Sequence, residues 1–427
     1  MSKISSFKNN PWSWIPTLYY TQGIPYVMVV TVSVIMYKDL GIANSEIALY
    51  TSLLSLPWAF KPLWSPFIDI FKTKRWWTYL MQSLIGVSFA GAALTLNTSF
   101  FFEGSLIFLF IVAFCSSTHD IAADGFYMLA LNEEDQSFFV GIRSTFFRLA
   151  MISGEGLLVV LAGIIATSSG SVNFSWISIL GIVALLLFVM SAYHSFILPK
   201  PDSDFPVRNE GESPFKAVWE TFVVFFKKDQ ILLAILFIML YRFGEGQLVK
   251  LAAPFLLEAR ELGGLGLSVT EVGVINGTIG LIALTIGGIF GGIVISRHGL
   301  KKWLWPMIIS MNLPNAAYWI LAHYQPESYG IISSLVGLEK FGYGFGFAAF
   351  LMYLIYIAKG SHKTAHYAFG TALMAFGMSI PGSISGFIQE AIGYEKFFIW
   401  VLISAIPIII VTPFIKIEDD FGKKKTS

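Results

Sequence analysis

The chain has 427 residues, of which 55% are hydrophobic and only 13% are charged, and its formal net charge is +1. Soluble domains carry about 25% charged residues, so this composition indicates an integral membrane protein. The near-neutral charge argues against nucleic acid as a partner. The single cysteine, Cys115, excludes a disulfide framework and a cysteine-based metal site.

The N-terminal stretch "MSKISSFKNNPW" lacks the small-residue cleavage site of a signal peptide, so the first apolar segment should be retained as a helix. About twelve apolar segments are long enough to span a membrane. The first six are expected near residues 12–37, 46–68, 76–96, 101–131, 139–167 and 173–198. The second six are expected near residues 230–257, 269–296, 302–323, 328–358, 364–390 and 394–416.

The longest polar stretch separates these two sets of segments. It predicts a six-helix bundle over residues 1–198, a cytoplasmic linker over 199–229, and a second six-helix bundle with a short cytoplasmic tail over 230–427. Lysine and arginine gather in "FKTKRWW", the linker, "SRHGLKK", "KGSHKTAH" and the tail, whereas the opposite loops hold little beyond Lys38, Arg260 and Lys396. This bias predicts a multi-pass protein of the cytoplasmic (inner) membrane with both termini in the cytoplasm.

Motifs of enzymes are absent from the sequence. No phosphate-cradling GxxxxGK loop, HExxH, GxSxG or EF-hand loop occurs. We therefore expect no enzymatic activity, no cofactor and no metal.

Two loops repeat a basic pattern, "SPFIDIFKTKR" after the second span and "GGIVISRHGLKK" after the eighth. The second copy matches the loop pattern Gly-x-x-x-Asp/Ser-Arg-x-Gly-x-Lys/Arg-Lys/Arg of the major facilitator superfamily, whose fold has two related halves around a central cavity. Chance similarity between two basic cytoplasmic loops is the alternative. The repeat predicts gating positions at Asp69, Lys74, Arg75, Arg297, Lys301 and Lys302.

The stretch "SSTHDIAADGFYML" places Asp120 and Asp124 one helical turn apart on the fourth span. Each carboxylate would cost roughly 2.5–3.5 kcal/mol at the bilayer centre. The depths of the two aspartates match those of Arg148 and Arg143 on the fifth span. A salt bridge that fixes helix packing and a role in proton or substrate binding are both compatible with this arrangement. We expect Asp120 to serve binding or coupling and Asp124 to hold the inner helix ends.

Three more carboxylates on predicted spans, Glu155, Glu245 and Glu339, are further candidates for proton coupling. For Glu155 the alternative is a hydrogen bond to a neighbouring helix, since the flanking glycines allow close backbone approach. Arg242 and Glu245 are three residues apart and could pair along one helix face. Neighbouring residues point about 100° apart on a helix, so Glu339 and Lys340 should not face one site together.

Aromatic, basic and polar residues on several spans are candidates for substrate binding, because aromatic faces suit sugar rings. Tyrosines also anchor helices at membrane surfaces, and Lys250 could extend to the outer surface instead. His119 ranks second, because it cannot share a helix face with Asp120. The substrate-binding candidates are Tyr20, Gln22, His119, Tyr127, Arg148, Tyr241, Arg242, Lys250, Lys340 and Tyr343.

The motifs "YYTQGIPY", "FKPLWSPFIDIF", "STHDIAADGF", "LYRFGEG" and "EKFGYGFGFAAFLMYLI" occur in this order along the chain. Together they resemble the branch of the major facilitator superfamily that contains AmpG-type muropeptide permeases and acetyl-CoA transporters. The resemblance implies an all-α major facilitator fold of about twelve helices. It also implies proton-driven import of GlcNAc-anhydroMurNAc peptides, which are products of peptidoglycan turnover. The family pattern extends to Asp120, Asp124, Arg148, Arg242, Glu245 and Glu339.

The sequence departs from the family pattern at two places, and these departures leave alternative functions open. His119 stands where the family usually has glutamine, and the pair Asp124–Gly125 looks more like the acetyl-CoA branch. Acetyl-CoA transport, import of a related amino sugar or disaccharide, and a scaffold role without transport are the alternatives. A scaffold gains nothing from buried charges, which favours a transporter whose partners are a small-molecule substrate, protons and membrane lipid. We expect it to be a monomer.

Overall fold

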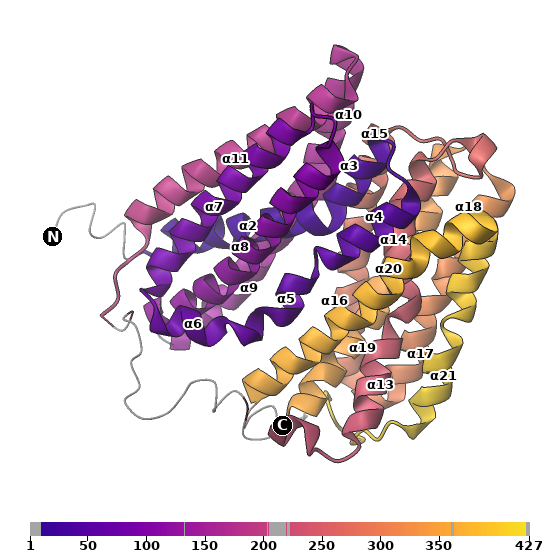
Figure 1. Cartoon of the computed structure of the whole chain (residues 1–427). Helices are drawn as coiled ribbons and strands as arrows, with labels where there is room; N and C mark the ends of the chain where they lie inside the picture. Colours follow the sequence, from indigo (N-terminus) through magenta and orange to yellow (C-terminus); the bar gives the residue numbers. More distant parts are fainter. Residues whose placement is uncertain are drawn as a thin grey trace. The chain divides into compact units, whose positions relative to one another are not determined.

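The computed structural model describes residues 10–131, 133–202, 204, 219, 223–359 and 363–423, and these residues form helices and connecting turns without a strand (Figure 1). Their contacts divide the chain into two compact units. Unit 1 comprises Met1–Leu40 and Phe60–Ser213, and unit 2 comprises Gly41–Ala59 and Pro214–Ser427. A short segment of the first half of the sequence, residues 41–59, thus belongs to the second unit by its contacts.

Five long helical stretches lie in the part of unit 1 that the structure describes. A π-helical turn at Met28–Val32 joins α2 to α3, and another at Ile152–Leu158 joins α9 to α10. The helices of this unit are α2 (Ile15–Val27), α3 (Ser33–Asp39), α6 (Ser65–Ile70), α7 (Lys74–Thr95), α8 (Phe101–Ala130), α9 (Glu133–Met151), α10 (Val159–Ser169) and α11 (Val172–Ile197). The α7 helix packs against both α8 and α11 (Figure 1).

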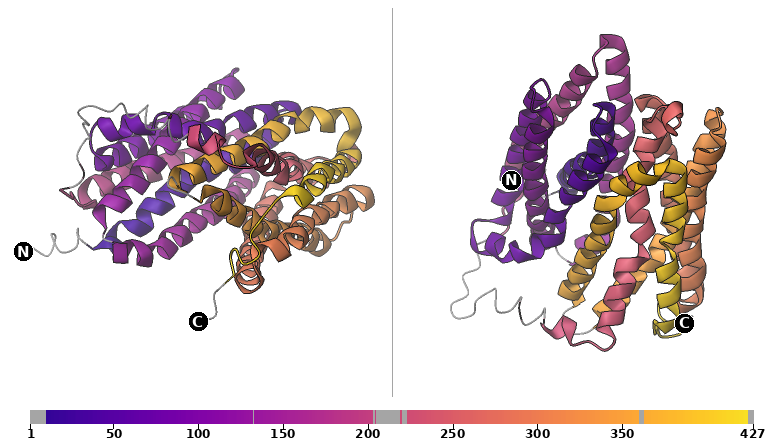
Figure 2. Two further views of the ribbon diagram at one scale, coloured as in Figure 1. Left: turned by 90° about the horizontal axis from the view of Figure 1, so that it is seen from below. Right: turned by 45° about the vertical axis from the view of Figure 1, so that its right-hand side comes forward.

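Unit 2 begins with α4 (Asn44–Leu53), and α5 (Leu56–Phe60) crosses the boundary between the units. Within α20, Gly393 has φ 77°, a conformation that favours glycine, and the helix reverses direction there, as the orange-to-yellow ribbon in Figure 2 shows. The remaining helices are α13 (Ile231–Tyr241), α14 (Phe243–Leu257), α15 (Val269–Val274), α16 (Leu281–His298), α17 (Leu300–Asn312), α18 (Ala316–Tyr324), α19 (Tyr329–Ala358), α20 (Lys363–Ile403) and α21 (Ile406–Val411).

Within the described residues, nine helices are long and apolar enough to cross a membrane. The difference from the twelve expected spans has a structural explanation. The expected eleventh and twelfth spans form one continuous stretch, Phe369–Phe414. The expected second span is broken into α4, α5 and α6, and the ninth is interrupted between α17 and α18 by a 3-10 turn that contains Pro314. The all-α membrane architecture expected from the sequence is confirmed for the described residues.

Glycines allow α16 and α19 to pack with their backbones in contact. A Cβ atom added at Gly287 would lie 2.1 Å from the carbonyl oxygen of Phe341, and one added at Gly344 would lie 2.0 Å from that of Leu284. Both distances are too short for any side chain. Close approach through small residues is a main source of helix association in membranes, so this pair of helices depends on its glycines.

We predict that Gly287→Ala lowers the midpoint of thermal unfolding in detergent, because overpacking against a backbone typically costs about 1–3 kcal/mol. Gly292→Ala is the matched control on the same helix, since no atom lies within 4 Å of a Cβ added there. An equal change in the unfolding midpoint of both variants would contradict the conclusion that α16 and α19 depend on close contact at Gly287.

Candidate functional site

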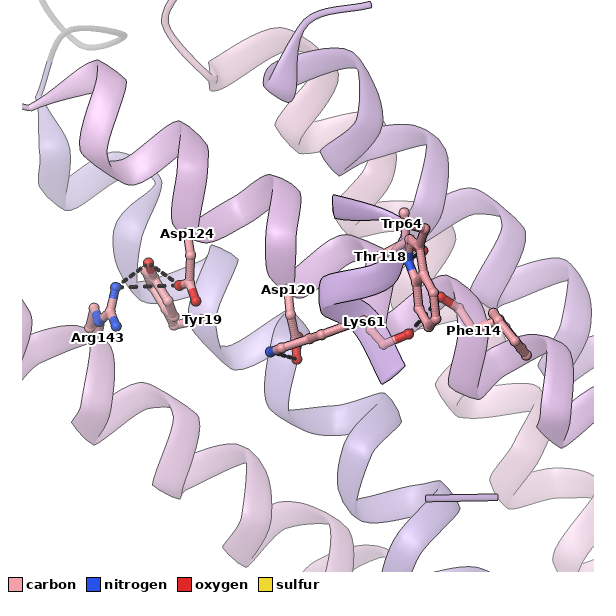
Figure 3. A network of polar contacts seen from close by, with 9 residues as sticks. Tyr19, Lys61, Trp64, Phe114, Thr118, Asp120, Asp124 and Arg143 are labelled. Atoms are coloured by element: carbon pink, nitrogen blue, oxygen red, sulfur yellow. Dashed lines mark hydrogen bonds and ion pairs between the residues drawn. The ribbon is translucent and has the colours of Figure 1, made fainter. Parts of the chain in front are cut away.

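Asp124 lies in a three-residue cluster of unit 1 (Figure 3). The Tyr19 hydroxyl donates to Asp124 Oδ1 at 3.1 Å, and Arg143 donates to the same carboxylate oxygen at 3.3 Å and to the Tyr19 hydroxyl at 2.9 Å. The guanidinium also lies over the rings of Tyr19 and Tyr127, 4.9 Å and 5.0 Å from their centroids. The expected pairing of Asp124 with Arg143 is confirmed, and it links α2, α8 and α9.

Asp120 pairs with a different cation from the one that the sequence indicated. Its carboxylate lies 3.7 Å from the Lys61 ammonium (Figure 3). Arg148, in contrast, is exposed on α9 and forms no ion pair with the described residues. The expected Asp120–Arg148 pair was therefore wrong. Lys61 follows α5 in a 3-10 turn, so the break in the second span brings an ammonium group to α8. Two residues before Asp120, Thr118 accepts a hydrogen bond from the Trp64 indole at 3.2 Å.

His119 lies in the interior of unit 1 within a chain of buried polar side chains. In the amide orientation of the structure, Gln82 donates to His119 Nε2 at 2.9 Å and accepts from His194 Nδ1 at 2.9 Å. Thr17 Oγ1 lies 3.0 Å from His194 Nε2. An imidazole nitrogen that accepts a hydrogen bond carries no proton, so this orientation holds His119 neutral. The chain joins α2, α7, α8 and α11, which favours a packing role for His119 over substrate binding.

Unit 2 buries a cluster of four charged side chains from α19 and from the junction of α13 and α14. Glu339 and Lys340 form an ion pair of 3.0 Å, and the Glu339 side chain is completely buried. Glu245 is also buried and lies within electrostatic range of Glu339, Lys340 and Arg242. The expectation that Glu339 and Lys340 do not face one site together stays a prediction, because an ion pair between adjacent residues does not fix which neighbouring surface either side chain faces.

Arg242 does not pair with Glu245 as the three-residue spacing suggested. The regular helix is interrupted at Arg242, where φ is −113° and ψ is 19°, so the spacing rule for one helix does not apply. The guanidinium instead donates to the Tyr343 hydroxyl and lies over the Tyr343 and Phe347 rings, 5.2 Å and 4.8 Å from their centroids. One oxygen of Glu245 and the Nε of Arg242 have no hydrogen-bond partner among the described residues.

Lys250 is buried, and its ammonium donates to Thr51 on α4 at 3.0 Å. It does not extend to an outer surface. Other polar contacts join the same segment to α20: the Asn44 amide donates to Gln389 and Tyr394, each at 2.7 Å, and the Ser55 and Ser379 hydroxyls lie 2.7 Å apart. Lys250 is therefore part of the polar contacts that hold residues 41–59 in unit 2.

The other candidate residues have varied surroundings. Tyr241 is fully buried, stacks on Phe350 and donates to the Gly346 carbonyl at 2.8 Å, as expected of a packing residue. Gln22 is buried on α2 with a side-chain oxygen that has no partner among the described residues. Tyr20 is half-buried on α2, and Glu155 lies in the π-helical turn between α9 and α10.

The predicted gating residues hold neighbouring segments within their own units. In unit 1, Asp204 accepts the backbone N–H groups of Lys74 and Arg75, and the Arg75 guanidinium donates to the carbonyls of Ser195 and Leu198. In unit 2, Lys301 pairs with Asp419 at 2.5 Å. Arg297 and Lys302 are exposed, and the side chain of Asp69 lies outside the described part of the chain.

Sequence reasoning missed Lys61, Tyr19, Gln82 and His194 as members of these polar contacts. Lys61 is the second residue of the quoted motif "FKPLWSPFIDIF", and Tyr19 directly precedes the candidate Tyr20. Gln82 and His194 are isolated polar residues in apolar spans, a signal that could have identified them. Among the described residues, no group of three or more histidine, cysteine or acidic side chains could hold a metal ion.

The Tyr19 cluster predicts unequal effects for two neighbouring tyrosines. Tyr19→Phe removes a buried hydroxyl bonded to Asp124 and Arg143, so it should lower the free energy of unfolding by about 1 kcal/mol. Tyr20→Phe is the matched control, because Tyr20 makes no hydrogen bond with the described residues and should leave stability unchanged. Thermal unfolding of the two purified variants checks this, and a greater loss for Tyr20→Phe would contradict the cluster.

Comparisons with known proteins agree with the geometry. The family model described as "Major Facilitator Superfamily" matches residues 19–386. The anhydromuropeptide permease of Escherichia coli is 28% identical over 366 residues, which cover 84% of this chain and 70% of that protein. The putative transporter AmpG 4 of Rickettsia conorii is 26% identical, with 91% and 92% covered. A solved bacterial homolog of the human lysosomal transporter Spinster has a TM-score of 0.73 at 13% identity, with 97% and 96% covered.

These relatives confirm the resemblance inferred from the motifs, and their names are those of permeases and transporters rather than of enzymes. The apolar helices make the chain a multi-pass membrane protein. The chain belongs to the major facilitator superfamily of membrane transporters.

Proposed function

We propose that this chain is a proton-coupled importer of GlcNAc-anhydroMurNAc peptides that works by alternating access across the cytoplasmic membrane. In this proposal both termini lie in the cytoplasm, and residues 1–198 and 230–427 form two bundles joined by the 199–229 linker. The protein would act as a monomer.

The main support for this proposal is the cluster of buried charges in unit 2. Arg242, Glu245, Glu339 and Lys340 bring two positive and two negative groups together in a part of the chain where burial of charge is costly. The Glu245 carboxylate forms no ion pair within 4 Å among the described residues, so a proton or the approach of a neighbouring cation can neutralise it. A group that can exchange one neutralising partner for another is suited to couple proton and substrate movement.

The same cluster supports a substrate of mixed charge. A muropeptide carries sugar rings, amide groups, carboxylates and an amine, and the cluster offers both signs of charge beside the Tyr343 and Phe347 rings. Asn315 adds a buried side-chain amide without a hydrogen-bond partner among the described residues, one turn before Tyr318, which lies within electrostatic range of Lys340. Acetyl-CoA, with several phosphate charges, would require a surplus of cations that this cluster lacks.

Alternating access requires some contacts to open during the cycle. Residues 41–59 belong to the first half of the sequence, yet hydrogen bonds hold them to α14 and α20. Asn44 donates to Gln389 and Tyr394, Thr51 accepts from Lys250, and the Ser55 and Ser379 hydroxyls bond to each other. Individual hydrogen bonds contribute only about 0.5–1.5 kcal/mol each, so such contacts can break and reform. We take them as the contacts that separate when the two halves of the sequence move apart.

A reversible cross-link tests this part of the proposal. Ser55→Cys with Ser379→Cys, in a Cys115→Ser background, replaces two hydroxyls 2.7 Å apart and should form a disulfide on oxidation. We expect oxidation to abolish uptake into proteoliposomes and reduction to restore it.

Ser83→Cys with Ser191→Cys is the matched control. These hydroxyls are also 2.7 Å apart, but they join α7 and α11 inside unit 1, so their disulfide should leave uptake nearly unchanged. Normal uptake by the oxidised Ser55–Ser379 variant would show that this contact does not need to open.

Uptake of labelled anhydro-muropeptide, disaccharide and acetyl-CoA into proteoliposomes under an imposed pH gradient tests the function itself. Wild-type protein should accumulate the muropeptide. Glu245→Gln and Asp120→Asn should each lose uphill accumulation by tenfold or more if they carry the coupling proton, while substrate exchange is partly retained. Glu395→Gln, at an exposed glutamate paired with His323, is the control and should transport normally.

Preferential accumulation of acetyl-CoA or of the free disaccharide would replace the proposed substrate. Normal uphill uptake by the Glu245 and Asp120 variants would exclude both carboxylates as essential proton carriers and direct attention to Glu339 and Glu155.

A further inference from the structure

Unit 2 contains a cavity of about 290 Å³ that is separate from its buried charge cluster. Its walls come from the residues before α13, the last turn of α19 and the segment that follows α21. The charged residues that line it are Lys228, Asp229, Lys359, Lys416 and Glu418. Leu233, Ala234 and Ile415 add apolar surface.

The lysines of this cavity lie just outside the apolar spans. Lys228 precedes the span Ile231–Leu257, Lys359 directly follows Tyr329–Ala358, and Lys416 comes two residues after Phe369–Phe414. All three therefore sit at the level where a bilayer changes from hydrocarbon to headgroups. A cavity at this level, with apolar and basic walls, faces the part of a lipid that carries its phosphate.

Two of the three lysines are fixed by the protein itself. The Lys228 ammonium donates to the carbonyls of Ile357 and Lys359 at 2.6 Å and 2.8 Å, which satisfies the C-terminal end of α19. The Lys359 ammonium pairs with Glu418 at 2.7 Å and lies over the Tyr356 ring. These contacts hold the C-terminal segment against α19 and form one wall of the cavity.

Lys416 is the third lysine that lines the cavity. It is exposed, and its ammonium makes no hydrogen bond or ion pair with the described residues. Three lysines against two carboxylates leave the lining with one positive charge. Partial burial lowers the pKa of Lys228, and an anion bound beside it would favour its charged form.

We propose that this cavity binds the phosphodiester headgroup of an anionic membrane lipid, with Lys416 as the principal phosphate ligand. Basic pockets at the ends of membrane helices are suited to such headgroups. Drug-sized ligands occupy pockets of roughly 300–1,000 Å³, so the cavity suits a smaller headgroup such as phosphoglycerol. The acyl chains would continue along the apolar surface toward the bilayer.

Native mass spectrometry of the full-length protein in detergent, titrated with short-chain phosphatidylglycerol, tests the proposal. Each lysine near a membrane surface contributes about 1 kcal/mol of attraction, so Lys416→Gln should weaken binding roughly fivefold. Lys416→Glu reverses the charge and should weaken binding further. Lys227→Gln is the control, because it removes the same charge from an exposed position close to the cavity but outside its lining.

In a second titration, the lipid is replaced by its soluble headgroup, glycerophosphoglycerol. Weak binding of this compound beside strong binding of the lipid identifies the membrane as the source of the ligand. Equal binding of both would keep the phosphodiester site but assign it to a soluble metabolite. Equal weakening by Lys416→Gln and Lys227→Gln, or no weakening by Lys416→Glu, would overturn the site.

Discussion

A charge inside a membrane helix is stabilised by an opposite charge or by hydrogen bonds within the protein, because the surrounding hydrocarbon offers neither. This constraint organises both units. In unit 1, Asp124 meets Arg143 and Tyr19, and Asp120 meets Lys61. In unit 2, Glu339 meets Lys340, while Arg242 bonds to Tyr343.

The two sets of charges differ in how completely they are enclosed. The Asp124 and Arg143 side chains are 41% and 31% exposed, so their ion pair is partly solvated and contributes modestly to stability. The Glu339 side chain is not exposed at all, and its pairing with Lys340 is correspondingly harder to break without a substitute partner. This contrast supports a holding role for Asp124 and a coupling role for the unit 2 cluster. The carboxylates of the unit 2 cluster, Glu245 and Glu339, are therefore candidates for the proton carrier beside Asp120, which the sequence had favoured.

Sequence reasoning worked where helices are regular and failed where they are broken. The depths of Asp124 and Arg143 could be compared by counting residues along two continuous helices, and the structure confirms their pairing. The partner of Asp120 could not be found this way, because Lys61 lies in a turn after α5 whose direction depends on tertiary packing. The Arg242–Glu245 pair failed for a related reason, since the chain leaves helical geometry at Arg242. The buried link from His119 through Gln82 to His194 joins three helices. The sequence alone does not show which residues of separate helices lie side by side.

The central claim is that substrate movement through this transporter is tied to proton movement by buried carboxylates. The most direct measurement records both fluxes at once in proteoliposomes that hold wild-type protein, with muropeptide added outside and no initial pH gradient. The account predicts that inward substrate flux draws protons inward, so that the external medium becomes more alkaline in fixed proportion to the substrate taken up. Muropeptide uptake with no accompanying proton movement would contradict it.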